Sequence, residues 1–340
     1  MLASADSRGT NQVVCTINSS HAINLLNHNA VCVDVALHSK LERRGVHVGY
    51  RFIIYDKPEA GIARITLNRP EVLNAVHIPL MEEIHQAADE AAKDDEVAVL
   101  IYRGAGRAFC VGRDFKYAGE LQTKDPDGWF AWRKRYRGFG PQTWTHPKAT
   151  IAQIHGHALG GGHDLAVSSD ITIAANGTQL GYPEARYGLL MGGRHVWNWL
   201  AGPKITKEYV FTGRTISAEE AVVCGLINRA VPLEKLEETV LSIARDIVTM
   251  ERRNPGYIGA NKTQINQRHL ELGSLTTFNP AVIAQFPNET KYLTDSKGSQ
   301  EKFFTKVSRE GFHKATDSMH EGFGETPTST VKKSSKSKKG

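Results

Sequence analysis

The sequence lacks several features that define specialised classes of protein. It has only four cysteines in 340 residues and no C-x-x-C pair, which argues against a disulfide framework and a structural zinc site and fits a reducing compartment. No apolar run approaches the roughly 18 residues that cross a bilayer. The first residues, MLASADSRGTNQVVC, lack the basic and apolar segments of a secretory signal. We therefore expect an intracellular protein without a membrane span, and the sequence leaves open whether it is cytoplasmic, mitochondrial or peroxisomal.

The chain has little net positive charge outside residues 326–340. The formal net charge is +6, but residues 326–340 hold five lysines and no acid, so the other residues carry only +1 (6 minus 5). A Lys/Ser segment with almost nothing apolar to bury is typical of a disordered tail. We interpret it as a solubilising tail, and the composition does not favour nucleic acid as a partner.

The periodicity of apolar residues divides the rest of the chain. Residues 1–49 show no sustained period and are interpreted as an N-terminal extension of unknown order. Between residues 50 and 194, strands alternate with helices, which predicts an α/β fold. The predicted strands are IARITLN (62–68), VAVLIY (97–102), ATIAQIHG (149–156) and DITIAA (170–175). Residues 195–325 predict helices, one of which begins with a Ser-x-x-Glu capping box at Ser217.

Three glycine-rich stretches carry the candidate chemistry. They are GAGRAFCVGRDF (104–115), HGHALGGGHDLAVSSD (155–170) and LGYPEARYGLLMGG (180–193). Glycine lets the backbone approach a ligand closely, and the first N–H groups of a helix have no partner within that helix. Two such N–H groups directed at one point form an oxyanion hole, which stabilises charge developing on a carbonyl oxygen.

Two carboxylates accompany these stretches. Asp164 falls in the first turn of the helix that the triple glycine opens, and Glu184 follows a proline in a loop. Two carboxylates beside an oxyanion hole can move protons at the carbons α and β to a carbonyl. Each motif also has an ordinary explanation, because glycine triplets serve tight turns and the helix dipole favours Asp in a first turn. Spacing alone does not bring the three stretches together.

Five blocks, in order and at similar intervals, resemble the enoyl-CoA hydratase/isomerase (crotonase) family. They are ITLNRPEVLNAV, GRAFCVGRDF, IHGHALGGGHDLAVSSDITIAA, YPEARYG and TGRTISAEEAVVCGLINRAVP. The resemblance implies a crotonase-like spiral of ββα repeats over residues 50–194 and a helical trimerisation region over residues 195–325. It therefore implies a homotrimer or a dimer of trimers. It also implies an acyl-CoA substrate, with no metal and no separate cofactor, because CoA arrives as part of the substrate.

The resemblance also assigns roles to individual positions. The two oxyanion-hole N–H groups fall on Arg113 and Gly161, and the family usually has a small residue where Arg113 stands. The implied catalytic residues are Asp164 and Glu184, and the implied CoA-binding residues are Asp114, Phe115 and Lys116.

The type of reaction stays open at this stage. Hydratases of the family carry glutamate where this chain has Asp164, and their two glutamates hold the water that adds to the double bond. Dienoyl-CoA isomerases carry Asp and Glu at the two positions, but they also have a further aspartate where this chain has Gly192. Hydratase, a lyase, is the first hypothesis and isomerase the alternative. A third is a non-catalytic family member that binds RNA or a protein.

Other chemically suggestive residues have ordinary interpretations. His155, His157 and His163 lie close in sequence, but they form no defined set of metal ligands. The tryptophans are interpreted as core or subunit contacts rather than the lining of an acyl pocket. Cys110, in an apolar strand, is interpreted as packed rather than reactive.

Overall fold

The computed structural model describes residues 46–47, 49–125, 139–187 and 196–271, together with Glu310 and Lys314. The predicted Lys/Ser tail (326–340) and nearly all of the predicted N-terminal extension (1–49) lie outside the described residues. So do Trp129, Trp132 and Gly192. In the described part of the chain, no helix is both long and apolar enough to span a membrane.

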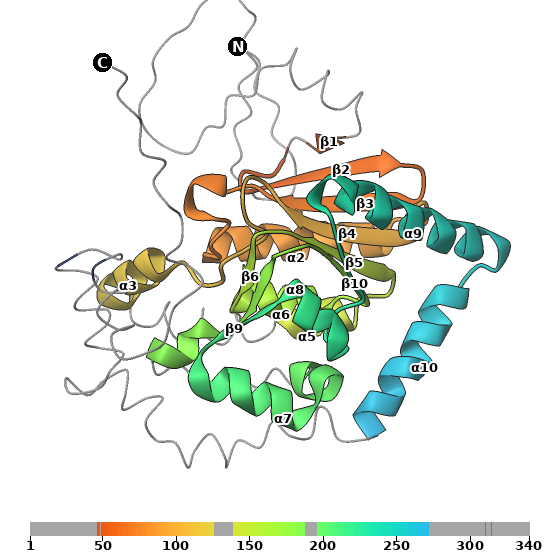
Figure 1. Cartoon of the computed structure of the whole chain (residues 1–340). Coiled ribbons are helices and arrows are strands. Elements are labelled where there is room, and N and C mark those ends of the chain that lie inside the picture. Colours follow the sequence, from red (N-terminus) through yellow and green to blue (C-terminus); the bar gives the residue numbers. More distant parts are fainter. Residues whose placement is uncertain are drawn as a thin grey trace, which may run out of the picture.

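Two sheets form the centre of the fold (Figure 1). The main sheet has the order β1-β2-β3-β4-β5-β7-β10 and the small sheet the order β6-β8-β9. The first three strands of the main sheet are antiparallel, and β3, β4, β5, β7 and β10 are parallel. The main-sheet strands are β1 (Val46–His47), β2 (Ile53–Glu59), β3 (Ile62–Leu67), β4 (Val99–Gly104), β5 (Ala149–Ile154), β7 (Ile171–Ala175) and β10 (Arg229–Val231). The small-sheet strands are β6 (His157–Leu159), β8 (Gln179–Gly181) and β9 (Thr215–Ser217).

The helices connect and cover these strands. The α-helices are α2 (Ile78–Lys93), α3 (Phe115–Lys124), α5 (Phe139–Trp144), α6 (Gly161–Ser168), α7 (Val196–Thr212), α8 (Ala218–Val223), α9 (Leu233–Arg253) and α10 (Tyr257–Glu271). Among the described residues there are also two short 3-10 helices, η1 (Pro70–Val72) and η2 (Pro183–Tyr187).

A repeated unit of two extended segments and a helix organises the chain. The succession β5–β6–α6 places one strand in the main sheet and the next in the small sheet, and β7–β8–η2 does the same. Two earlier units follow the same path, because after β3 and β4 the chain forms the bridges Val76↔Arg113 and Cys110↔Ala158. The second layer thus continues from Val76 through residues 110–113 to β6 and β8. This arrangement is the predicted spiral of ββα repeats.

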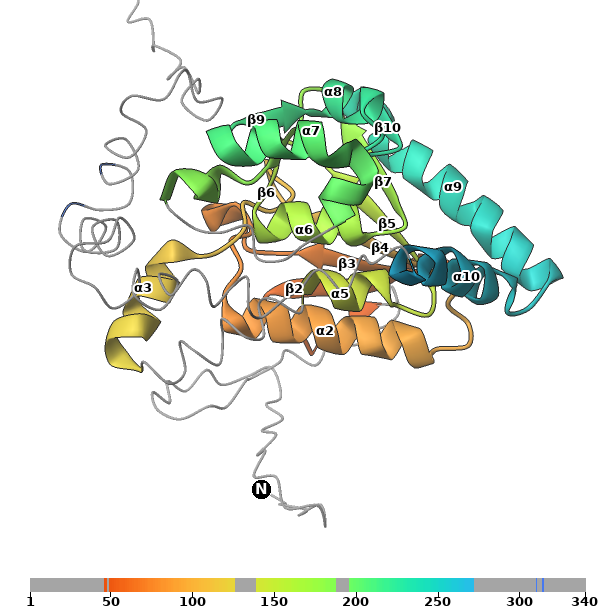
Figure 2. The same cartoon turned by 90° about the horizontal axis from the view of Figure 1, so that it is seen from below.

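Successive side chains of a strand point to opposite faces of the main sheet, and each face packs into its own hydrophobic core. In β4, Val99 and Ile101 pack into the cluster on the α9 side, whereas Leu100 and Tyr102 belong to the cluster on the other side. Helix α9 buries Leu236, Val240, Ala244 and Val248, at a spacing of four residues, against the first of these faces. In Figure 1, α9 lies above the sheet and α2, α5 and α6 lie below it; the view from below in Figure 2 brings these three helices to the front.

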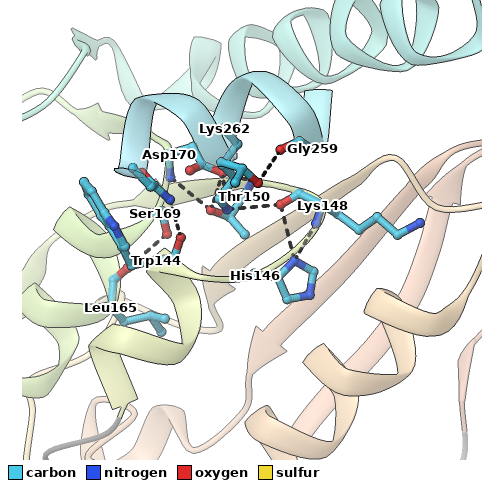
Figure 3. Close-up of polar contacts among 11 residues, drawn as sticks. Trp144, His146, Lys148, Thr150, Leu165, Ser169, Asp170, Gly259 and Lys262 are labelled. Carbon is cyan, nitrogen blue, oxygen red and sulfur yellow. Dashed lines mark hydrogen bonds and ion pairs between the residues drawn. The ribbon is translucent and has the colours of Figure 1, made fainter. Parts of the chain in front are cut away.

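A partly buried ion pair docks α10 onto this framework (Figure 3). The Lys262 ammonium lies 2.7 Å from Asp170 Oδ2 and donates to the Lys148 carbonyl at 3.2 Å. The same Asp170 oxygen accepts from the Thr150 amide at 2.7 Å and from the Thr150 hydroxyl at 2.9 Å. Burial lowers the pKa of Lys262, while the Asp170 carboxylate opposes that shift. The contact therefore ties α10 to the loop before β5 and to the start of β7.

Most elements agree with the sequence-based predictions. The four predicted strands correspond to β3, β4, β5 and β7, and the Ser217 capping box is formed with Glu220. The structure differs in two respects. The region predicted as helical, 195–325, also contributes β9 and β10, and Glu184 lies in η2 rather than in an irregular loop.

Candidate active site

The glycine-rich stretches meet where strands of the second layer lead into helices. Gly112, with a φ of 85°, lies directly against the Gly160–Gly161 turn. A Cβ added to Gly112 would stand 2.8 Å from the Leu159 carbonyl oxygen, 3.1 Å from the Gly161 nitrogen and 3.2 Å from the Gly160 Cα. Any side chain at position 112 would separate the two segments. The missing side chain therefore brings the backbone at 112–113 beside the start of α6.

The two amides that the sequence singles out are part of this junction. Gly161 is the first residue of α6, so its N–H has no acceptor within the helix. Arg113 follows Gly112, and hydrogen bonds on both sides hold it: the Val76 amide donates to the Gly112 carbonyl at 2.6 Å, and the Asp114 amide donates to the Val76 carbonyl at 2.9 Å. The structure thus brings the two predicted donor positions, from stretches far apart in sequence, to adjoining segments of backbone.

Two glycines of the triplet, Gly160 and Gly162, meet different steric demands. Gly160 has a left-handed φ of 51°, and its amide donates to the Gly181 carbonyl at 2.9 Å. A Cβ on Gly160 would overlap Glu184 Oε1 and stand 2.7 Å from Glu184 Cδ. A Cβ on Gly162 would overlap the Cys110 carbonyl oxygen. Gly160 therefore leaves room for the Glu184 carboxylate, and Gly162 lets α6 approach the preceding repeat.

The two predicted carboxylates come together at this turn. Asp164 lies in the first turn of α6 and is buried, with 3% of its surface exposed. Glu184 comes from η2, and its carboxylate rests on the Cα of Gly160. The residue as a whole is half-buried, but its Oε2 is inaccessible to solvent and has no hydrogen-bond partner in the described part of the chain. The arrangement places both acids next to the backbone of Gly160 and Gly161.

Burial gives Glu184 an unusual proton affinity. Removal from water raises the pKa of its carboxyl from 4.5 to about 7. A hydrogen bond from its own backbone N–H opposes the rise, the negative charge of Asp164 adds to it, and the positive charge of Arg113 opposes it. The three predicted residues thus lie close enough to interact electrostatically. A carboxyl with a pKa near neutrality can both donate and accept a proton at physiological pH.

The stretch predicted to follow the CoA moiety forms the start of α3. Asp114 is the N-cap of this helix, and its carboxylate accepts from the Tyr117 amide at 3.1 Å. It also pairs with Arg69, whose Nη1 lies 3.0 Å from Asp114 Oδ2. Phe115 is half-buried and Lys116 is exposed. The Asp114 side chain therefore holds the loop and the helix start, while the Lys116 side chain is accessible to an anionic ligand.

Sequence reasoning missed a residue that shapes this loop. Asn74 is fully buried and has a left-handed φ of 57°. Its Nδ2 lies 2.9 Å from the carbonyl oxygens of Ala105 and Ala108 and 3.1 Å from that of Phe109. Its Oδ1 accepts from the Arg69 amide at 2.8 Å. Asn74 therefore fixes the segment that leads to Gly112. The signal was present in the block LNRPEVLNAV, where an asparagine follows a hydrophobic residue at the end of a short turn.

The other suggestive residues have structural surroundings. Among the described residues, no group of three or more His, Cys, Asp or Glu side chains is arranged to hold a metal ion. Cys110 is fully buried, burial raises the pKa of its thiol to about 12, and its thiol donates to the Asn74 carbonyl. Trp197 is 1% exposed and lies in the core, as predicted, whereas Trp199 is 36% exposed.

A separate cavity does not coincide with these residues. It has a volume of about 260 Å³ and lies between α2, β4 and α5, where Ile84, Tyr102 and His146 are among its lining residues. Its described lining includes neither Asp164 nor Glu184. We locate the candidate site by the meeting of the glycine turns and the two acids, because these groups supply a chemistry that the cavity lacks.

The fold and the site together define an α/β protein of ββα repeats with two acids beside a glycine-lined backbone turn. Comparison with known proteins gives its family. Residues 57–270 match the family model for enoyl-CoA hydratase/isomerase. Because this match covers more than half of the chain, the chain belongs to the enoyl-CoA hydratase/isomerase family, and its fold is the crotonase fold.

Individual relatives agree with this assignment. A short-chain-enoyl-CoA hydratase of Clostridium acetobutylicum is 30% identical over 269 residues, which cover 76% of this chain and 97% of the relative. A probable enoyl-CoA hydratase of Mycobacterium bovis is 34% identical over 206 residues, covering 59% of this chain and 77% of the relative. The crystal structure of an enoyl-CoA hydratase/isomerase from Xanthobacter autotrophicus Py2 has a TM-score of 0.73 and 32% identity, covering 81% of this chain and all of that one.

Proposed function

We propose that the chain is a hydratase-like lyase that adds water to, or removes it from, an α,β-unsaturated acyl-CoA. The observation that carries the proposal is the convergence at the Gly160–Gly161 turn of Asp164, Glu184 and the backbone that bears the Arg113 amide. The acids lie on different elements, and the turn itself opens a helix. Thioester chemistry at the α and β carbons requires this combination of amide donors and proton-transfer groups.

The proposed reaction uses each group at a stated atom. The amides of Arg113 and Gly161 donate to the thioester oxygen, where negative charge develops as the double bond is attacked. One carboxylate takes a proton from water while the water oxygen bonds to the β carbon, and the other carboxyl gives its proton to the α carbon. The sum is addition of H and OH across the double bond. Glu184, with a pKa of about 7, is suited to exchange protons in either direction.

A decisive test is turnover of a panel of enoyl-CoA and dienoyl-CoA thioesters, followed by mass spectrometry for the gain of one water. Asp164→Asn and Glu184→Gln keep the side-chain sizes but cannot exchange protons, so each should lower kcat by about a hundredfold or more and leave CoA binding nearly unchanged. Lys124→Gln, on an exposed part of α3, is a matched control for a change of one charge. Full activity in both acid variants would refute the assigned roles.

Isomerisation remains a second candidate, and the length of Asp164 favours it. Aspartate is one methylene shorter than glutamate, so its carboxylate is set back by about an ångström, which is enough to alter how a water is held. Asp164→Glu distinguishes the two reactions, because a hydratase should keep or gain water addition and an isomerase should lose proton transfer. In H₂¹⁸O, only water addition or hydrolysis labels the product. Turnover without label would establish the isomerase and reject the hydratase.

We also propose the setting in which the enzyme works. CoA would arrive with the substrate, near Asp114, Phe115 and Lys116, and the reaction would need no metal or separate cofactor. The proposed location is intracellular. A homotrimer or a dimer of trimers is supported by large apolar side chains that are exposed in the single chain, such as Phe211 at 78% and Val223 at 89%. Analytical ultracentrifugation would reject this assembly if it gave the mass of one chain.

A further inference from the structure

A buried histidine is adjacent in sequence to one of the two acids. His163 precedes Asp164 in α6, and none of its surface is exposed. Neither Nδ1 nor Nε2 has a hydrogen-bond partner in the described part of the chain. Burial lowers the pKa of the imidazole to about 3, so the ring is neutral at physiological pH. Burying an imidazole without a hydrogen-bond partner is unfavourable, so the position of this ring calls for a physical reason.

The ring of His163 is held between two larger aromatic rings. Its centroid lies 5.2 Å from that of Tyr182 and 4.5 Å from that of Trp197, and both contacts are edge-on. Tyr182 and Trp197 in turn stack on each other, with centroids 5.8 Å apart. All three side chains are buried. Tyr182 Oη and Trp197 Nε1 also lack partners among the described residues, and the contacts within this aromatic cluster are contacts between rings.

The aromatic cluster connects the elements that bear the two acids. His163 is adjacent to Asp164 on α6, and Tyr182 stands two residues before Glu184, next to the start of η2. Trp197 lies in the first turn of α7. The backbone adds one tie between the same elements, from the Gly160 amide to the Gly181 carbonyl at 2.9 Å. The contact between His163 and Tyr182 is therefore a side-chain tie between the segment of Asp164 and the segment of Glu184.

We propose that His163 is a positioning residue, whose ring, held between Tyr182 and Trp197, sets the placement of Glu184 relative to Asp164 and keeps water from the buried side of the Glu184 carboxylate. This proposal rests on the proposed function, because it assigns a role within the same site. His163 itself transfers no proton. Its role requires only the volume and shape of a planar ring.

The surroundings of Glu184 indicate what loss of the ring should do. The charged groups that act on its carboxyl are Asp164 from α6 and Arg113 from the turn before α3, and the neutral thiol of Cys110 also lies near. Burial has a larger effect on the Glu184 pKa than either charge. Water entering a space left by the imidazole would therefore lower this pKa from about 7 toward its ordinary value of 4.5.

The experiment compares His163→Ala with His163→Phe in the full-length enzyme, with His157→Ala as a matched control for loss of a nearby half-buried histidine. We expect His163→Ala to lower kcat at least tenfold with little change in KM, because about an ångström of misplacement costs up to a hundredfold in rate. The limb of the pH–rate profile that belongs to Glu184 should move to lower pH. His163→Phe should restore kcat to within about threefold and return the limb to its wild-type position.

A second readout does not depend on turnover. Infrared difference spectra recorded during a pH titration report the carboxyl of Glu184, with Glu184→Gln identifying its band. The band should titrate at lower pH in His163→Ala than in the wild type and His163→Phe. If the wild type turns over no enoyl-CoA, the proposed function fails, while this titration still tests the positioning role.

Three outcomes would overturn the positioning role. One is wild-type kcat and an unmoved Glu184 titration in folded His163→Ala, even if its Tm falls. Another is equal damage in folded His163→Phe and His163→Ala, which would show that the imidazole nitrogens matter rather than the ring. If His163→Ala does not fold, Tyr182→Leu removes the same contact from the η2 side, and wild-type behaviour of that variant is the third contradicting outcome.

Discussion

Gly160→Ala offers a direct test of how the candidate site is built. The glycine has a φ of 51°, and a Cβ there would overlap Glu184 Oε1 and stand 2.7 Å from Cδ and 3.2 Å from Oε2. Since the carboxylate and the methyl group cannot both keep their places, the carboxylate must move by about an ångström or more. A displacement of that size costs about a hundredfold in rate. The positive φ adds about 1–3 kcal/mol of backbone strain for a residue with a Cβ.

A matched control separates strain from displacement. Gly177 also has a positive φ, 74°, but a Cβ there would meet nothing within 4 Å. Gly177→Ala should therefore lower the Tm through strain alone and leave kcat close to the wild type. Gly160→Ala should lower both. The assay is kcat and KM with a short-chain enoyl-CoA, accompanied by thermal unfolding of both variants.

A double variant shows whether the loss acts through Glu184. If Gly160→Ala works by moving this carboxylate, adding it to Glu184→Gln should cost little further activity, because the two changes disable the same group. Wild-type kcat in a folded Gly160→Ala enzyme would refute the reasoning. So would a double variant in which the two losses multiply.

Four further predictions follow from other parts of the structure. Gly161→Pro removes one N–H and strains the turn against Gly112, so kcat should fall about a hundredfold or more in the folded variant; unchanged kcat would remove Gly161 from the oxyanion hole. Folding raises the pKa of the Glu184 carboxyl from 4.5 to about 7. Its contribution to protein stability is therefore full below pH 4.5 and is lost as the pH rises through about 7, because the buried carboxyl must then carry a charge. Glu184→Gln should accordingly raise the Tm at pH 8 but not at pH 4. A Tm difference between variant and wild type that does not depend on pH would contradict the raised pKa. Lys262→Met removes the cation that pairs with Asp170 and should destabilise the protein by about 1 kcal/mol in urea unfolding, whereas Lys235→Met on α9 should not; equal effects would reject the docking role of the ion pair. Deleting residues 326–340 should leave turnover and Tm nearly unchanged, and a large loss of either would show that the Lys/Ser segment contacts the rest of the protein.

An element could be predicted from the sequence when it was long and when its apolar residues followed a regular pattern. The strands β3, β4, β5 and β7 have five or six residues each, which is long enough to show an alternating or a mainly apolar pattern. By contrast, β9 and β10 have three residues each, too few for any period, and only their neighbours make them strands. For this reason the region after residue 194 was predicted as wholly helical. Tertiary pairing extends the main sheet into it through β10, which lies parallel to β7.

The residues of the candidate site could be predicted from the sequence, but their positions relative to one another in space could not. Helix-start glycines and an acid in the first turn of α6 are visible in the sequence. Gly160 makes room for a carboxylate from η2, and Gly162 makes room for the carbonyl of residue 110. Both are contacts between different repeats, so the spacing of residues within one stretch of sequence does not reveal them. His163 shows the same limit. In sequence it is one of three nearby histidines, and only the packed rings of Tyr182 and Trp197 distinguish it from the others.

The geometry of the repeats explains why the acids are found at this turn. Each repeat ends an extended segment of the second layer just before a helix or a 3-10 helix begins, so successive repeats bring such junctions side by side. One repeat contributes the backbone at Arg113, the next contributes Gly161 and Asp164, and the third contributes Glu184. Glycines at the contacts allow these junctions to approach until side chains and amides from three repeats share one space. Burial in that space raises the pKa of Glu184 more than the charge of Asp164 does. The proton affinity of the candidate acid is therefore set chiefly by how closely the repeats pack.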